Sequence, residues 1–419
     1  MISAPSMGGF WLLSAEVIGA GTLVLLLLVV GRRRLDRVTT FVLAPLGALA
    51  TWWFVRAATI GDPRSFFPFG VSLLGFGGAF AAVRPLTPRQ KEVAAIFLAS
   101  IGALEALAGF YGVTMRASPL ALPDQNLWRL ASTVTYSNAA GLILAMALVV
   151  ALGLDGRWWY SRSLVCVCTA GLLATQSRGA LIGALFGLLF VPLARCRIMW
   201  LPMALGAVSG VVAVATSPSG KPEPIVAVAL ALCLGASIVV RPMPLSVTTR
   251  RGAIAAAVGV VAVAGVAGAV SHAALARRLL TSVSLFDRGP EWSSAYHQFL
   301  TAPWLGVGPD QLIPLLGSHG TFAHFAHNEY LQVADGAGVI GVALLLFAAV
   351  AVARSVRRTD VGSSCALGAL IAFALCGAFD FDWHLPMIAL MGGWVAGLAG
   401  NATPGAPSDS TDAARARVT

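Results

Sequence analysis

The stretch STVTYSNAAGLILAMALVVALGL, residues 132–154, decides the fold class of this chain. It contains no Asp, Glu, Lys or Arg, and its polar side chains all lie in its first seven residues. A helix of about 20 mostly apolar residues is long enough to cross the hydrocarbon core of a bilayer. We therefore interpret this stretch as a membrane-spanning helix with a polar N-terminal end.

The whole chain has the same character. Of its 419 residues, 58% are hydrophobic and 11% are charged, whereas soluble globular domains carry roughly 25% charged residues. This composition excludes a cytosolic enzyme, a nucleic-acid-binding domain and a disordered protein. The sequence predicts an all-α, polytopic transmembrane helical bundle of about 12–13 spans.

Thirteen apolar stretches, separated by charged or Pro- and Gly-rich segments, are candidate spans. They form one predicted transmembrane domain, residues 1–400, and the polar segment 401–419 is predicted to be a disordered cytoplasmic tail. The candidate spans are residues 10–30, 38–58, 66–83, 93–112, 132–154, 160–176, 180–194, 198–216, 225–240, 253–270, 336–353, 363–379 and 386–400.

The distribution of Lys and Arg predicts the orientation, because cytoplasmic loops of membrane proteins are enriched in these residues. If residues 31–37 are cytoplasmic, alternation puts 19 of the 28 basic residues on that side, and every cytoplasmic loop is basic. We therefore expect a multi-pass protein of the cell inner (plasma) membrane with its N-terminus outside and its C-terminus in the cytoplasm. The nine basic residues outside are Arg56, Arg64, Arg116, Arg129, Arg178, Lys221, Arg277, Arg278 and Arg288.

The longest hydrophilic segment, residues 271–334, is then one large extracytoplasmic loop. Within it, Trp292, Ala295 and Phe299 recur at helical spacing before Pro303. Such a pattern is typical of a short amphipathic helix that lies in the plane of the membrane interface. Nucleotide-activated donors are absent from this side, so an enzyme here needs a membrane-borne or secreted substrate.

Two arginines on this side are candidate anion-binding residues. Arg178 lies in a charged break between two apolar runs, where the alternative interpretation is a snorkelling side chain that anchors a helix end. Arg288 directly precedes the amphipathic stretch, and the free N–H groups of a helix N-terminus already favour an anion there. An interfacial helix by itself does not explain Arg288.

The segment 323–332 holds the candidate base. His324 and His327 are three residues apart and Glu329 follows, but the spacing is not the HExxH of a zinc site. A proton-transfer site at the mouth of the bundle fits the segment better, because imidazole titrates near neutrality as a general base requires.

Other polar residues admit two interpretations each. Asp380 and Asp382 alternate with aromatic residues in the segment 379–385, which an interfacial aromatic belt would also explain. Glu105 lies inside a predicted helix as either a buried partner of an outer-face Arg or a proton-pathway residue. Asn138 stands at the polar start of its span.

Together, and in this order, these features resemble the O-antigen ligase and polymerase family of bacterial polytopic membrane glycosyltransferases. The resemblance covers roughly residues 130–390. It rests on Ser177-Arg178-Gly179-Ala180, Arg288, the turn Pro303…Gly306-x-Gly308, His327-Asn328-x-x-Leu331 and Gly338-x-x-Gly341.

The resemblance implies transfer of a glycan from a polyprenyl-diphosphate donor, such as undecaprenyl diphosphate, to a hydroxyl of a lipid or glycan acceptor outside the cytoplasm. Arg178 and Arg288 would bind the diphosphate and His327 would be the base, with no cofactor and no nucleic acid involved. The further residues expected to bind substrate are Asn328, His324, Glu329, Asn138, Trp292 and Tyr330.

Metal-independent catalysis is a further expectation, because two guanidinium groups bring the charge that one divalent metal ion would bring. The pair Asp380 and Asp382 is the counter-candidate for a metal site. The family usually has an acid two residues before the first Gly of the helix start, and that place is Gly336 here. Asp335 stands one position early, about 100° away on a helix.

The alternative function is a transporter of lipid-linked glycans, a flippase. Such a protein would have intramembrane charges along a central path and two related halves. The polar residues here concentrate at one face instead, and no similarity between halves is visible.

Overall fold

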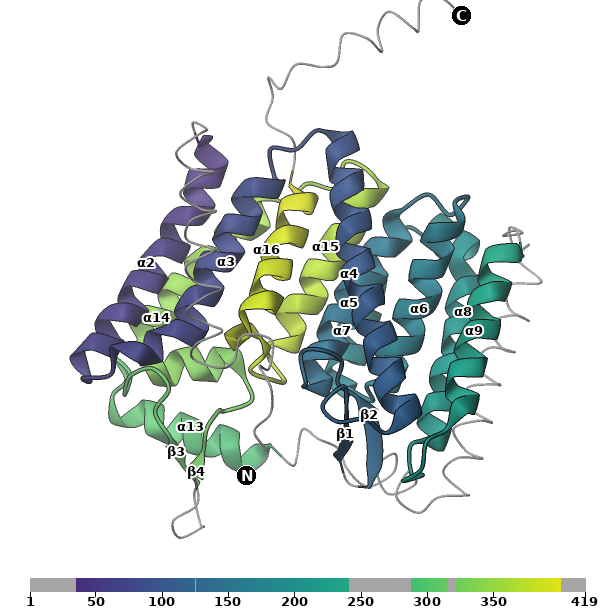
Figure 1. Ribbon diagram of the computed structural model, residues 1–419. Coiled ribbons are helices and arrows are strands. Elements are labelled where there is room, and N and C mark those ends of the chain that lie inside the picture. Colours follow the sequence, from purple (N-terminus) through teal and green to yellow (C-terminus); the bar gives the residue numbers. More distant parts are fainter. Residues whose placement is uncertain (1–34, 125, 241–287, 316–321, 401–419) are drawn as a thin grey trace, which may run out of the picture.

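The computed structural model describes residues 35–124, 126–240, 288–315 and 322–400. In these ranges the chain is an all-α bundle, as predicted, and five helical stretches are long and apolar enough to cross a membrane (Figure 1). The helices are α2 (Arg37–Thr59), α3 (Phe67–Val83), α4 (Pro88–Met115), α5 (Ser137–Gly153), α6 (Trp159–Ala174), α7 (Arg178–Leu188), α8 (Leu193–Thr216), α9 (Pro224–Val239), α13 (Gly289–Thr301), α14 (Glu329–Ser355), α15 (Val361–Cys376) and α16 (Pro386–Ala399).

Each candidate span within the described residues corresponds to one of these helices, and α13 is the predicted amphipathic helix. The candidates 10–30 and 253–270, and the predicted tail 401–419, lie outside the described residues. Two short 3₁₀ helices, η1 (Pro63–Phe66) and η2 (Asp382–His384), precede α3 and α16.

Helix starts follow from local sequence. Thr87 and Gln90 form a reciprocal capping box at the start of α4, and Pro88 occupies its first turn, where a missing N–H costs nothing. Asp360 and Ser363 form the same arrangement at α15. These caps satisfy backbone N–H groups that have no partner inside the helix.

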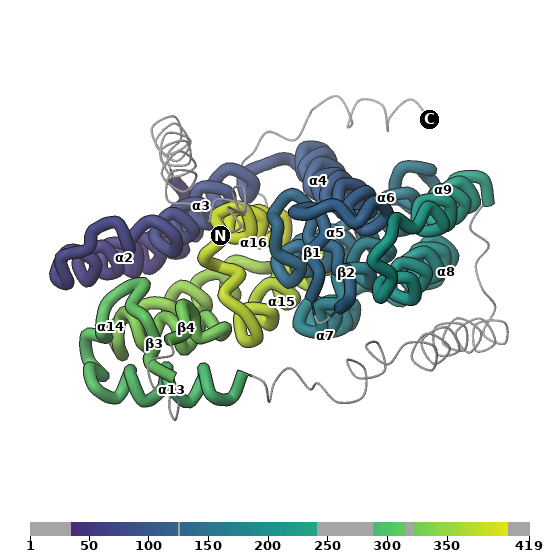
Figure 2. The backbone as a smooth tube through the Cα atoms, turned by 60° about the horizontal axis from the view of Figure 1, so that its bottom comes forward, coloured from purple at the N-terminus to yellow at the C-terminus, as the bar shows by residue number. Residues whose placement is uncertain are grey.

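The core is centred on α5, where all residues from Ala139 to Leu152 are buried. This helix packs against α4, α6, α7 and α15, so it is apolar on every side. Small residues allow the close approach: a Cβ on Gly102 of α4 would lie 2.2 Å from the Cβ of Ala147. Figure 2 shows the result as a flattened bundle with α2 and α14 at one edge and α8 and α9 at the other.

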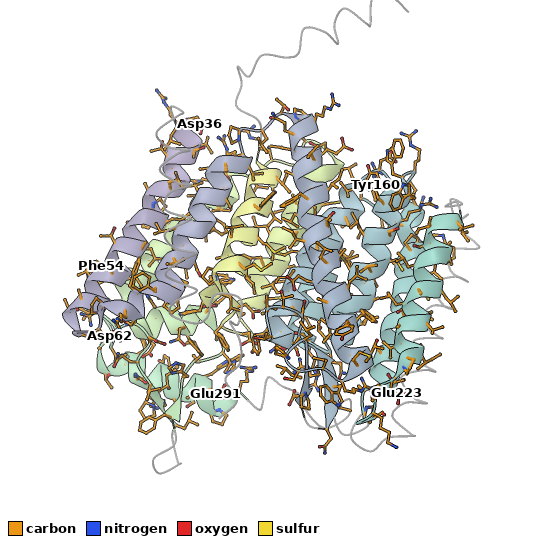
Figure 3. The ribbon with its side chains drawn as sticks, in the orientation of Figure 1. Asp36, Phe54, Asp62, Tyr160, Glu223 and Glu291 are labelled. Carbon is orange, nitrogen blue, oxygen red and sulfur yellow. The ribbon has the colours of Figure 1, made fainter. Side chains whose placement is uncertain are left out.

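The two ends of the bundle differ. Asp36 and Tyr160 lie at one end, and Asp62, Glu223 and Glu291 lie at the other (Figure 3). The second end, which we call the hairpin end, carries α13 and two short antiparallel hairpins that the sequence did not predict. These pair β1 (Ala121–Asp124) with β2 (Leu127–Leu130) and β3 (Ile313–Pro314) with β4 (Phe322–Ala323).

Helix α14 begins at Glu329, seven residues before the predicted span, and is broken at Gly338 (φ 67°, ψ −167°). The turn 303–308 packs into this break: Val339 N–H donates to the carbonyl of Pro303 (2.8 Å), and Val307 N–H donates to that of Asp335 (2.8 Å). A Cβ on Gly338 would lie 2.4 Å from the Trp304 carbonyl oxygen. The turn Pro303…Gly306-x-Gly308 and the segment Gly338-x-x-Gly341 therefore pack directly against each other.

Candidate active site

Asp380 is the centre of a polar cluster at the hairpin end. Its side chain is 4% exposed, and it lies in the turn between α15 and α16. Oδ1 lies 2.8 Å from His327 Nδ1, and Oδ2 accepts a hydrogen bond from the Tyr136 hydroxyl (2.6 Å) and another from Asn138 Nδ2. The ring of Phe381 stacks between Tyr136 and Phe325, which holds this turn in place.

His327 directly precedes the N-cap of α14 and has a left-handed backbone (φ 49°). With Nδ1 on the Asp380 carboxylate, Nε2 is left as the nitrogen that can accept a proton. Trp292 of α13 donates its indole N–H to the His327 carbonyl (3.4 Å). Contacts on both sides of the residue therefore set the direction of the imidazole.

Arg288, at the start of α13, joins the same cluster. Its guanidinium lies 3.7 Å from Asp380 Oδ2 and 3.9 Å from Glu291 Oε2, which are loose ion pairs. Nη1 is buried and has no hydrogen-bond partner among the described residues. Burial works to lower the pKa of Arg288, but the negative charges of Asp380 and Glu291 help to raise it overall, so the side chain stays cationic and can donate to an anionic ligand.

A chain of hydrogen bonds leads from Arg129 through Asn138 to Asp380. Arg129 of β2 donates to Asn138 Oδ1 (2.9 Å), to Asp124 Oδ2 (2.8 Å) and to the carbonyl of Thr175 (2.9 Å). Asn138 in turn donates to Asp380 and to the Tyr136 hydroxyl (3.1 Å). The β1–β2 hairpin thus helps to orient the Asp380 carboxylate, through Arg129 and then Asn138.

Arg178 is the first residue of α7, after the N-cap Ser177, and is half-buried. The next residue packs on the same turn as Asp380, because a Cβ on Gly179 would lie 3.3 Å from the Cβ of Phe379. The start of α7 also packs on α5, since a Cβ on Gly141 would lie 2.7 Å from that of Ala180. The structure therefore brings the Arg178 segment to the Asp380 turn.

A second, buried layer lies beneath the cluster. Glu329 is fully buried: Oε2 lies 2.9 Å from His384 Nδ1, and Oε1 accepts the backbone N–H groups of Trp383 and His384. Asp382 is 2% exposed and its Oδ1 has no hydrogen-bond partner among the described residues. Burial, with the charges of Asp380 and Glu329, raises the pKa of Asp382 well above its ordinary value. Glu329 therefore holds the turn, and no surface of it is open to a substrate.

Five further residues were expected to bind substrate, and the structure places only some of them in the polar cluster. Asn328 caps α14 and donates to the carbonyl of Ala378 (3.1 Å). Tyr330 is 41% exposed and donates its hydroxyl to the carbonyl of Ala374 (2.9 Å). The His324 side chain is 55% exposed, and its Nε2 lies 3.9 Å from Asp310 Oδ1. Asn138 and Trp292 do lie in the cluster.

Asp380, Tyr136 and Arg129 are the members that sequence reasoning did not assign to this site. The available signal was the acid-aromatic pattern of residues 379–385, which also fits an aromatic belt. Glu105, the other open case, accepts hydrogen bonds from the backbone N–H (3.2 Å) and hydroxyl (2.7 Å) of Thr133 and from Ser132. It anchors the loop before α5.

The packing around Gly336 explains why the acid that the family usually has at this position is absent here. A Cβ there would lie 2.8 Å from the ring of Trp53 in α2, so no larger side chain fits. Asp335, one residue earlier, is buried, and its Oδ1 has no partner in the part of the chain that the structure describes. The described residues contain no group of three or more His, Cys, Asp and Glu side chains placed to hold a metal ion.

Residues 219–346 match the family model described as O-Antigen ligase. The chain is therefore similar to the O-antigen ligase family over these 128 of its 419 residues. This similarity and the apolar helices together point to a multi-pass membrane protein. The matched segment includes Arg288 and His327, whereas Asp380 and Asn138 lie outside it. No curated protein matches the chain.

Proposed function

We propose that this protein transfers a glycan from a polyprenyl-diphosphate donor to a hydroxyl acceptor at the extracytoplasmic face, as in surface polysaccharide ligation or polymerisation. The observation that carries the proposal is the His327–Asp380 pair, with Nδ1 and Oδ1 2.8 Å apart. Beside it lies the buried Arg288 Nη1, which has no hydrogen-bond partner among the described residues, and both residues fall in the segment that matches the O-antigen ligase family. A base and an anion-binding group at one site are what this reaction requires.

His327 acts as the general base. Asp380 accepts the Nδ1 proton and favours the tautomer whose Nε2 lone pair is free. As Nε2 takes the proton of the acceptor hydroxyl, the acceptor oxygen attacks the anomeric carbon. The bond from that carbon to the diphosphate oxygen breaks, and the diphosphate leaves with the electron pair. A single displacement inverts the anomeric centre.

Arg288 and Arg178 stabilise the departing diphosphate. Negative charge grows on the leaving oxygens as the bond breaks, and cations held in place stabilise that charge without reorganisation. A guanidinium suits this role because its planar fork grips phosphate oxygens with two hydrogen bonds and keeps its charge. We propose that no divalent metal is required.

The concentration of these groups at the hairpin end favours transfer over transport, because a transporter of lipid-linked glycans needs polar residues along a path through the bundle. The decisive assay measures product formation by purified protein from a lipid-linked donor. Two alternative acceptors are compared: a lipid core and a growing glycan. Formation of either product supports an enzyme and tells a ligase from a polymerase.

Two arms sharpen this assay. His327→Ala should lose about 10²–10⁴-fold in turnover while donor binding survives, whereas His324→Ala, matched in residue type, should lose much less. Activity should also persist in excess EDTA. An active His327→Ala variant would overturn the assignment of the base. EDTA inhibition that Mg²⁺ reverses would overturn the expectation of metal-independent catalysis.

A further inference from the structure

A cavity of about 600 Å³ lies at the end of the bundle opposite the hairpin end. Its lining residues come from the start of α4, the end of α5, the start of α8, the start of α15 and the end of α16. Ligand pockets of proteins typically have volumes of about 300–1,000 Å³, so the space suits part of a small amphiphile. Among the described residues, those of the proposed transfer site do not line this cavity.

The inner wall is apolar. It is formed by side chains from α4, α5, α15 and α16 that together present only carbon atoms. These are Ala95, Val150, Leu154, Ala366 and Leu398. Such a wall binds hydrocarbon and excludes a fully hydrated ion as the sole occupant.

Charges of both signs line the same cavity: the cations are Lys91 and Arg195, and the carboxylates are Glu92, Asp155 and Asp360. Asp155 is paired with Arg157, an exposed residue outside the lining, whose Nη2 lies 2.8 Å from the Asp155 carboxylate. With Asp155 set aside, the two cations and two carboxylates, Glu92 and Asp360, remain in the lining.

The Lys91 ammonium has capacity for a ligand. It donates to the backbone carbonyl of Gly400 and has no carboxylate at ion-pair distance among the described residues. Arg195 lies 3.2 Å from the carbonyl of Leu154 and only loosely, at 4.0 Å, near Asp155. Ammonium has three donors and guanidinium five, so both groups have donors left.

We propose that this cavity binds a phospholipid whose headgroup carries both a phosphate and a primary ammonium group. A purely anionic headgroup would meet Glu92 and Asp360, and a cationic one would meet Lys91 and Arg195. A zwitterionic headgroup satisfies both pairs, with phosphate on the cations and N–H groups on the carboxylates, while the acyl chains cover the apolar wall.

Binding of three probes to the purified full-length chain tests this assignment by native mass spectrometry. The probes are phosphatidylethanolamine, phosphatidylcholine and phosphatidylglycerol with identical acyl chains. Phosphatidylethanolamine should bind best, because phosphatidylcholine lacks N–H donors and phosphatidylglycerol lacks the cation. Equal retention of all three, or a preference for phosphatidylglycerol, overturns the proposal.

Variants locate the binding. Lys91→Ala should weaken phosphatidylethanolamine binding by about fivefold, from about 1 kcal/mol per basic residue near a lipid phosphate. Ala95→Phe, which narrows the apolar wall without changing charge, should also weaken it. Arg89→Ala, an exposed residue outside the cavity, is the control and should leave binding unchanged. Wild-type binding in both Lys91→Ala and Ala95→Phe contradicts the site.

The competing occupant is the chain's own segment 401–419, which follows Gly400 at the cavity wall. A variant that ends at Gly400 separates the two. If it binds phosphatidylethanolamine as the full chain does, the lipid is the occupant. If only the shortened chain binds lipid, the segment occupies the cavity and the proposal is wrong.

Discussion

Arg288 Nη1 is a buried donor without a hydrogen-bond partner among the described residues, and a guanidinium left in that state is costly unless a ligand satisfies it. The same side chain lies at the N-terminal end of α13, beside the carboxylate that holds His327. At the scale of single residues, the site therefore combines His327 Nε2, which can accept a proton, with the Arg288 guanidinium, which can donate further hydrogen bonds.

Replacing Arg288 or Arg178 by Ala should lower turnover by about 10²–10³-fold, the usual loss when one donor to a developing charge is removed. Lys should rescue poorly, because an ammonium is a point charge without the planar fork. Arg64→Ala, which removes an exposed cation at the same end, is the control in product-formation assays. Near-normal turnover of both Ala variants at equal protein abundance would remove the arginines from the mechanism.

Asp380 and Asp382 form a matched pair for testing the orientation of the base. Asp380→Asn should reduce turnover by about 10²–10⁴-fold, because an amide no longer fixes the His327 tautomer. Asp382→Asn should stay within a few-fold of wild type, since the Asp382 Oδ1 atom has no hydrogen-bond partner among the described residues. Comparison of the two variants as a function of pH checks this, and equal losses would show that the turn matters only structurally.

Asp382 should also make the stability of the folded protein depend on pH. Burial raises the pKa of Asp382 in the folded state, so the folded protein holds that proton while the unfolded chain has released it. The stabilisation is complete below the ordinary pKa of 3.8 and is lost as pH rises through the raised folded-state value. Asp382→Asn should flatten this fall in the thermal-unfolding midpoint, and an unchanged pH profile would contradict it.

At the scale of elements, the broken helix α14 and the turn 303–308 act as one unit. Arg56 of α2 donates to the carbonyls of Leu305 (2.8 Å) and Gly306 (2.8 Å), and the Trp52 indole N–H donates to that of Ala337 (2.9 Å) at the break. Backbone groups freed by the break are thus satisfied by α2 and the turn. This contact supports the helix start that carries Asn328, next to His327.

Gly338→Ala should destabilise this unit by at least about 1–3 kcal/mol, because a side chain at positive φ is strained and its Cβ would lie 2.4 Å from the Trp304 carbonyl oxygen. Gly47→Ala in α2, where a Cβ meets nothing within 4 Å, should be neutral or slightly stabilising. Thermal unfolding of the two variants in one detergent measures the difference. A Gly338→Ala midpoint equal to that of Gly47→Ala would show that the break is not required.

At the scale of the whole molecule, the helices separate the loops into two sets at opposite ends, as the alternation of predicted spans requires (Figure 3). Arg288, His327, Asn138 and Asp380 all belong to the hairpin end, while the cavity lined by Lys91 belongs to the other. The excess of basic residues assigned to the end opposite the hairpin end is the ground for expecting that end in the cytoplasm.

Single cysteines in a variant lacking the six native ones test this orientation. Ser293→Cys, exposed on α13, should react with an impermeant thiol reagent in intact cells, and Arg89→Cys, exposed at the other end, should react only after lysis. The opposite labelling pattern would place the cluster in the cytoplasm and contradict the proposed extracytoplasmic transfer.

Sequence by itself determined the membrane-spanning helices, the amphipathic α13 and the candidate residues Arg288 and His327, because apolar runs, helical periodicity and short motifs are local properties of the chain. Only the tertiary structure decided that Asp380 orients His327, that Arg129 acts through Asn138, and that Glu329 is buried beneath the site. Residues 136, 288, 327 and 380 come together only when four separate elements pack, and no local pattern encodes that contact. The physical reason is that a buried carboxylate takes its role from the donors packed around it, and those donors lie far apart in the sequence.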